Sequence, residues 1–104
     1  MPPYLNGEPM AMEGALPLGM VEQAEFSVMR CQLSQHDRLV LVSDGIAEAT
    51  DAGGKLFGFD RVLELARSRP SAAGIADAAQ SFGQEDDISV IAVTRVAVAA
   101  PAFA

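Results

Sequence analysis

Two apolar stretches predict the central strands of the fold. Residues 38–43 (RLVLVS) contain an unbroken apolar run, which is typical of a strand covered on both faces. Residues 88–98 (ISVIAVTRVAV) predict a last strand near the end of the chain. Polar and apolar residues also partly alternate over 24–33, which predicts a strand with one solvent-facing side and leaves room for a bulge at Val28-Met29.

Two turns frame the first half of this pattern. Asn6-Gly7 separates two short strand candidates, Tyr4-Leu5 and Pro9–Met12, and Asn-Gly is the strongest short-range signal for a hairpin. Ser34–Asp37 (SQHD) predicts a second turn directly before the strand at 38–43. His36 is expected to be a solvent-exposed residue of that turn.

Two helices are predicted between the apolar strands. Residues 59–68 show helical spacing with Asp60 as the expected N-cap, and their shared face is apolar (Val62, Leu63 and Ala66). Ser71 is the expected N-cap of a second, alanine-rich helix that continues to about Ser81.

This order of elements predicts the fold class. Strands come first, then two helices, then a strand, and the strand–helix–strand alternation of a parallel sheet is absent. We therefore expect an α+β fold with an antiparallel β-sheet and two helices between the last two strands. The length allows one domain, which we place at residues 1–98, followed by a frayed apolar tail at 99–104.

Composition narrows the function classes. The chain of 104 residues carries 14 acidic and 7 basic side chains, for a net charge of −7, and its basic residues are too scattered for nucleic-acid binding. Apolar runs stay short of the ~20 residues that span a membrane, and the N-terminus lacks the pattern of a signal peptide. The single cysteine, Cys31, excludes an intramolecular disulfide and is expected to be a buried thiol. A cytoplasmic location is expected.

Acidic residues flank the two apolar strands. Asp44-Gly45 follows the first strand, with Glu48 just beyond it, and Glu85-Asp86-Asp87 precedes the last strand. If these strands are antiparallel neighbours, Asp44 meets Asp86 or Asp87 at one sheet edge. Crowded carboxylates persist when a cation neutralises them, and oxygen ligands suit Mg²⁺ or Mn²⁺. The alternative is that each acidic group is an ordinary solvated turn, because Asp-Gly commonly forms turns.

The run from Asp37 to Leu65 (DRLVLVSDGIAEATDAGGKLFGFDRVLEL) resembles the second half of the PPM-type metal-dependent protein phosphatases, best in their bacterial SpoIIE-like branch. The shared motifs are Asp44-Gly45, Glu48-Ala49, Gly53-Gly54 and Phe57-Gly58. Residues 85–93 (EDDISVIAV) resemble the closing motif of that family, and 2–5 (PPYL) and 16–19 (LPLG) also fit in order. One position departs from the family, which usually has glycine where this chain has His36.

The resemblance implies a function and a site. Asp44 and Asp86 would be metal ligands, with Gly45, Glu48 and Asp87 in supporting roles. In the family two Mg²⁺ or Mn²⁺ ions hold a bridging water as the nucleophile, so no side chain would attack the phosphate. The substrate would be a phosphorylated Ser/Thr protein, by family analogy an anti-sigma-factor antagonist.

The resemblance also implies an incomplete domain. The family fold is a pair of packed β-sheets with helices outside, and further acidic ligands come from its N-terminal half. This chain resembles the C-terminal half, a partial sandwich, and is expected to be inactive alone. The alternative is a non-catalytic remnant or protein-interaction module. Without an opposing sheet, we expect an open apolar face and self-association.

Overall fold

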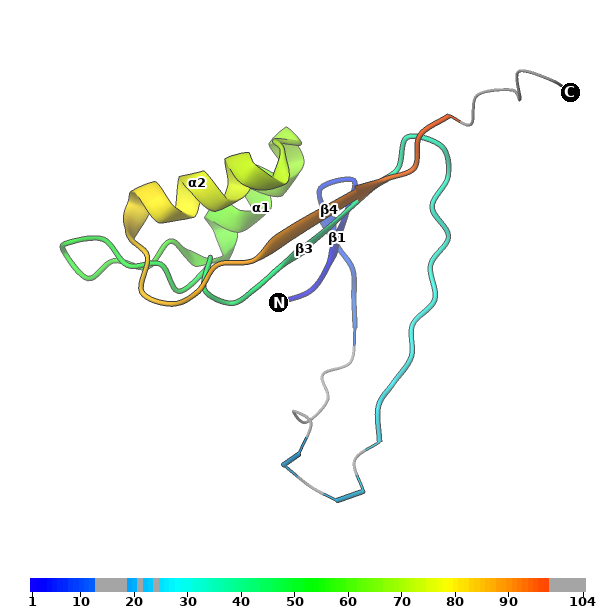
Figure 1. Ribbon diagram of the computed structural model, residues 1–104, viewed down its shortest axis with the longest axis horizontal. Coiled ribbons are helices and arrows are strands. Elements are labelled where there is room, and N and C mark those ends of the chain that lie inside the picture. Colours follow the sequence, from blue (N-terminus) through cyan, green and yellow to red (C-terminus); the bar gives the residue numbers. More distant parts are fainter. Residues whose placement is uncertain (13–18, 21, 24, 98–104) are drawn as a thin grey trace, which may run out of the picture.

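The computed structural model describes residues 1–12, 19–20, 22–23 and 25–97 and has the predicted α+β fold (Figure 1). In chain order its elements are β1 (Tyr4–Leu5), β2 (Glu8–Pro9), β3 (Arg38–Val42), α1 (Gly58–Ser68), α2 (Ala72–Gly83) and β4 (Val90–Thr94). The four strands form one antiparallel sheet in the order β2-β1-β3-β4. Both helices connect β3 to β4 and lie on one side of the sheet. The predicted tail at 99–104 lies outside the described residues.

The predicted N-terminal hairpin is confirmed, with a shorter second strand. Asn6 and Gly7 have positive φ angles of 50° and 84°, as a two-residue turn between twisted strands requires. A Cβ atom at Gly7 would lie 2.8 Å from Arg67 Cα, so this turn also packs tightly against α1. Arg67 donates two hydrogen bonds to the Glu8 carboxylate, at 2.9 and 3.2 Å, and this pairing lowers the pKa of Glu8. The hairpin is therefore docked on the helix.

The core lies between the sheet and the two helices. Tyr4 and Val40 are adjacent on β1 and β3 and are both buried. Ile46, Val62 and Ile75 are the largest fully buried side chains. They come from the loop after β3, from α1 and from α2, so the helical face predicted from apolar spacing is the face that packs on the sheet.

One of the two predicted N-caps is correct. The Ser71 hydroxyl accepts a hydrogen bond from the Gly74 N–H at 3.0 Å, as an N-cap serine should. The prediction for Asp60 is wrong, because α1 begins at Gly58 and its N-cap residue is Phe57, without a side-chain cap. Asp60 instead lies in the first turn of α1, where a carboxylate interacts favourably with the helix dipole.

The expectation that the strand at 38–43 is covered on both faces is wrong. Leu41 is 41% exposed, and its cross-strand partner Ile91 is 56% exposed. Leu39 pairs with Val93, which is also exposed, and all four side chains share the face away from the helices. The helices cover only the opposite face, so an apolar surface remains open.

The predicted strand at 24–33 does not form in the described residues 25–33. This segment runs away from the sheet (Figure 1), and Val28 is 81% exposed. Cys31 is exposed as well, which corrects the expectation of a buried thiol. An alternating strand needs a sheet to pair with, and the described residues 25–33 pair with none of the four strands. Ala24 itself lies outside the described residues.

The turn before β3 places His36 in a backbone conformation that favours glycine. The Asp37 N–H donates to the Ser34 carbonyl at 3.0 Å, and His36, the third residue of the turn, has a φ of 71°. The His36 N–H donates to the Arg95 carbonyl, and the Arg95 N–H donates to the Asp37 carbonyl. His36 and Asp37 therefore both lie opposite Arg95, which is the pattern of a β-bulge. The Asn6 amide and the Ser34 N–H hold the pKa of the Asp37 carboxyl below its usual value. His36 is exposed, as predicted.

We expect His36→Gly to raise the free energy of unfolding by about 1 kcal/mol, because glycine adopts a positive φ without steric penalty. Urea denaturation of both proteins measures the change. Asn6→Gly is the matched control, since Asn6 also has a positive φ but its side chain hydrogen-bonds Asp37 and the Arg38 N–H. That control should lower stability. Equal effects of the two substitutions would contradict the assignment of strain to His36.

Candidate metal-binding edge of the sheet

The pairing of β3 and β4 brings the two acidic segments to one edge of the sheet. The strands are antiparallel neighbours with Val42 opposite Val90, as the sequence predicted. The ladder continues one residue further, where the Ser43 N–H donates to the Ser89 carbonyl at 2.9 Å. The end of β3 therefore lies beside the start of β4, which places Asp44-Gly45 next to Asp86-Asp87.

Gly45 is the point of closest approach between the two segments. A Cβ atom at Gly45 would lie 2.2 Å from the Asp87 carbonyl oxygen and 3.4 Å from that of Asp86. Any side chain would overlap the facing backbone, so only glycine fits here. The Asp-Gly pair is thus explained by packing between β3 and β4, and the alternative of an isolated turn leaves this contact unexplained.

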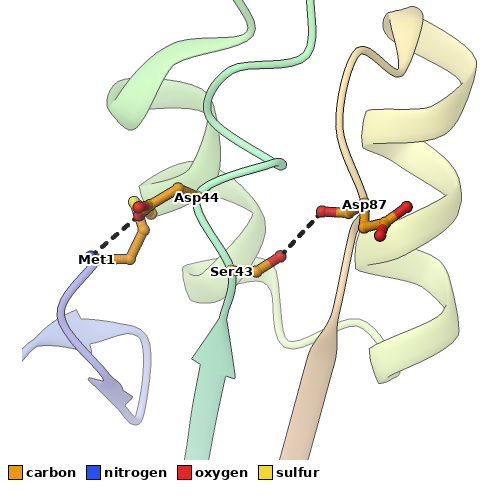
Figure 2. Close-up of polar contacts among 4 residues, drawn as sticks. All are labelled: Met1, Ser43, Asp44 and Asp87. Atoms are coloured by element: carbon orange, nitrogen blue, oxygen red, sulfur yellow. Dashed lines mark hydrogen bonds and ion pairs between the residues drawn. The ribbon is translucent and has the colours of Figure 1, made fainter. Parts of the chain in front are cut away.

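Ser43 ties the same two segments together through its side chain. Its hydroxyl donates to the Asp87 carbonyl at 3.4 Å (Figure 2), and it accepts from the Ser89 N–H at 2.8 Å. Ser43 is not among the site residues predicted from the sequence. Its signal was a polar residue at the end of an apolar strand, directly before the acidic pair.

The loop after β3 keeps Glu48 on the same side as Asp44. The Glu48 N–H donates to the Asp44 carbonyl at 3.0 Å, so the chain turns once between them. The intervening Ile46 and Ala47 are buried and anchor this turn in the core. Asp44 and Glu48 together line a hollow of about 290 Å³ whose other walls are mainly apolar, including Leu56 and Phe59.

The carboxylates themselves do not converge. Asp44 Oδ1 pairs with the N-terminal ammonium of Met1 at 3.3 Å, whereas the Asp87 carboxylate points away from Asp44 (Figure 2). Asp86 Oδ1 accepts from the Asp87 N–H at 2.8 Å. Within the described ranges, no three His, Cys, Asp or Glu side chains are grouped closely enough to hold a metal ion.

The oxygen donors at this edge suit a hard cation such as Mg²⁺ or Mn²⁺, but they are too few to hold two such cations. Asp44 is exposed and already has a positive group beside it, so this position accepts positive charge. Carboxylate oxygens are the ligands that Mg²⁺ and Mn²⁺ prefer. Two dications side by side need more negative charge than Asp44 and Asp86 supply. Among the described residues these donors are therefore of the kind that binds a divalent cation, but they are not grouped as a metal site.

An antiparallel α+β fold with an Asp-Gly pair and an Asp-Asp pair at one sheet edge is the arrangement expected of a PPM-type phosphatase domain. Residues 6–96 match the family model described as Stage II sporulation protein E (SpoIIE), and the chain belongs to this family. The match extends from the turn of the N-terminal hairpin through β4 and includes both acidic segments. No curated protein and no solved structure matches the chain. Neither helix of the described residues is long and apolar enough to cross a membrane.

Proposed function

We propose that this chain is the C-terminal half of a cytoplasmic, metal-dependent protein Ser/Thr phosphatase. The observation that carries the proposal is the backbone contact at Gly45, which holds Asp44 beside Asp86 and Asp87. Membership of the SpoIIE family supports the same chemistry. The substrate class is a protein phosphorylated on serine or threonine, with an anti-sigma-factor antagonist as the candidate suggested by family analogy.

Each residue of the edge has a separate task in this proposal. Asp44 and Asp86 each give carboxylate oxygens to Mg²⁺ or Mn²⁺. Gly45 permits the close approach of the two strands, and Ser43 fixes their relative position. Glu48 and Asp87 add negative charge around the ligands. Bound metal of this kind supplies an activated water and neutralises phosphoryl oxygens.

The proposal assigns the remaining ligands to an N-terminal half of the domain. If a second sheet supplies these ligands, that sheet can also pack against the open face of β3 and β4. That face carries Leu39, Leu41, Ile91 and Val93. An exposed apolar sheet face favours association, so we expect the chain to self-associate when the other half is absent.

A second candidate function rests on this same face. A protein-interaction module without turnover would use the open apolar surface to bind a partner, and it would need no complete metal site. The absence of a three-ligand group among the described residues is compatible with this alternative. The two functions predict different results when the N-terminal half is supplied: the phosphatase gains turnover, whereas the interaction module binds without turnover.

The test compares the 104-residue chain alone with the chain mixed with the N-terminal half of a SpoIIE-family domain. Alone, it should self-associate in sedimentation, bind Mn²⁺ weakly, and hydrolyse an aryl phosphate negligibly. The mixture should form a one-to-one complex with Mn²⁺-dependent activity. Strong EDTA-sensitive hydrolysis by the chain alone would show that the ligand count is wrong. A stable complex without turnover would favour the interaction module.

A further inference from the structure

A second polar site lies at the opposite end of the β3–β4 pair. An open depression of about 490 Å³, which we call a cavity for brevity, lies between the sheet and the linker that joins α1 to α2. Arg38 of β3 and Thr94 of β4, which are cross-strand neighbours, line one side, and Arg69, Pro70 and Ser71 line the other. Because Arg38 and Asp44 are six residues apart along an extended chain, the cavity is about 20 Å from the acidic edge. We refer to it as the linker cavity.

Arg38 brings a positive charge into this cavity without an acidic partner. Its side chain is buried, with 9% of the residue exposed, and its Nη2 donates to the Pro70 carbonyl. The ion pairs among the described residues are Met1–Asp44 and Arg67–Glu8, so no described carboxylate pairs with Arg38. A guanidinium has five N–H donors, and a buried charge without a counter-ion is unfavourable. This arrangement favours an anion nearby.

The start of α2 adds uncharged donors to the same cavity. Ser71 accepts from the Gly74 N–H through its hydroxyl and from the Ile75 N–H through its carbonyl. The N–H groups of Ala72 and Ala73 have no acceptor within the helix, because they belong to its first turn. The first turn of α2 contains no acidic residue that would compete for them. The positive end of the helix dipole therefore faces the site.

Arg69 supplies a second guanidinium from the linker itself. It follows α1 with a φ of 54°, and its Nη2 donates to the His36 carbonyl at 3.2 Å, which holds the side chain at the mouth of the cavity. The nearby Asp37 carboxylate hydrogen-bonds the Asn6 amide and the Ser34 N–H, and it also interacts electrostatically with Arg69, although the two do not form an ion pair. Arg38, Arg69, the start of α2 and Thr94 thus line one open depression.

We propose that the linker cavity binds a tetrahedral oxyanion, either free phosphate or a phosphomonoester. Guanidinium groups and helix N-termini are the donors that proteins use for phosphate oxygens, and two arginines favour a dianion over a monovalent carboxylate. The cavity has room for a group beyond the phosphate itself. The site uses none of the acidic-edge residues, so it does not depend on the phosphatase proposal.

The test titrates the 104-residue chain with inorganic phosphate and, separately, with N-acetyl-phosphoserine amide, in EDTA and at constant pH and ionic strength. Amide NMR shifts are followed, with acetate as the carboxylate comparison. We expect saturable shifts centred on Ala72, Ala73 and Thr94 below about 10 mM phosphate, and little response to acetate. Tighter binding of the phosphoserine compound would identify a phosphorylated side chain as the ligand of the cavity. Equal binding of the two compounds would identify free phosphate as the ligand.

Two arginine variants and one control decide the assignment. Arg69→Gln should weaken phosphate binding about tenfold without changing the fold, because the side chain is exposed. Arg38→Lys keeps the positive charge but removes the planar set of guanidinium N–H donors, so it should also weaken phosphate binding. Arg30→Gln, which removes an exposed arginine from residues 25–33, should leave binding unchanged. Unsaturable shifts in the unsubstituted chain, or equal affinity in Arg69→Gln and the control, would overturn the proposal.

Discussion

Asp44→Asn or Asp86→Asn, each made in the chain paired with an N-terminal half, is expected to lower Mn²⁺-dependent turnover by about 100-fold or more. Asparagine keeps the size of aspartate and one oxygen donor but removes the negative charge that holds a dication. The two residues belong to neighbouring strand ends, so both substitutions act on the same centre. Steady-state hydrolysis of an aryl phosphate at several Mn²⁺ concentrations measures the loss.

Asp77→Asn is the matched control for these variants. Asp77 is exposed on α2, away from the acidic edge, and the substitution removes the same charge. It should leave turnover unchanged. If Asp44→Asn retained full activity at limiting Mn²⁺, Asp44 would not be a ligand, and Glu48 or Asp87 would be the next carboxylate to test.

Gly45→Ala is expected to lower the free energy of unfolding by about 2–3 kcal/mol. The new Cβ would lie 2.2 Å from the Asp87 carbonyl oxygen and 3.0 Å from its carbonyl carbon. Both are backbone atoms, so relief requires the ends of β3 and β4 to separate. That movement would also disturb the Ser43 hydrogen bonds that join the same segments. Urea unfolding measures the destabilisation.

Gly53→Ala is the comparison that isolates this effect. Gly53 lies in the loop before α1, where a Cβ would come no closer than 3.4 Å to its neighbours, at an oxygen of the Asp51 side chain. Stability should change little. Equal destabilisation by the two substitutions would mean that the contact at Gly45 is not responsible.

Local signals in the sequence predicted the parts of the fold that local interactions determine. Asn6-Gly7 specified the hairpin because both residues tolerate positive φ. Ser71 specified the start of α2 because its hydroxyl caps a nearby N–H. The adjacency of the segments Asp44-Gly45 and Asp86-Asp87 also followed from pairing two apolar strands in the antiparallel sense.

Patterns that depend on a distant surface were less informative. The alternation over 24–33 resembled a strand, but the described residues 25–33 pair with no strand of the sheet, and Val28 is 81% exposed. The run at 38–43 looked covered on both faces, yet Leu41 is exposed because the helices lie on one side only. The direction of each carboxylate was also beyond sequence reasoning, since it depends on local contacts such as the one between Asp44 and the Met1 amine.

The acidic edge joins residues that are far apart in the chain, which has a consequence for folding kinetics. Ser43 and Ser89 contact each other across 46 positions, and both helices lie between them. Closing so long a loop is entropically unfavourable, and non-local strand pairing is slow compared with helix formation. We therefore expect α1 and α2 to form early and the β3–β4 ladder to form late. A cation that binds at this edge would slow unfolding more than it speeds folding.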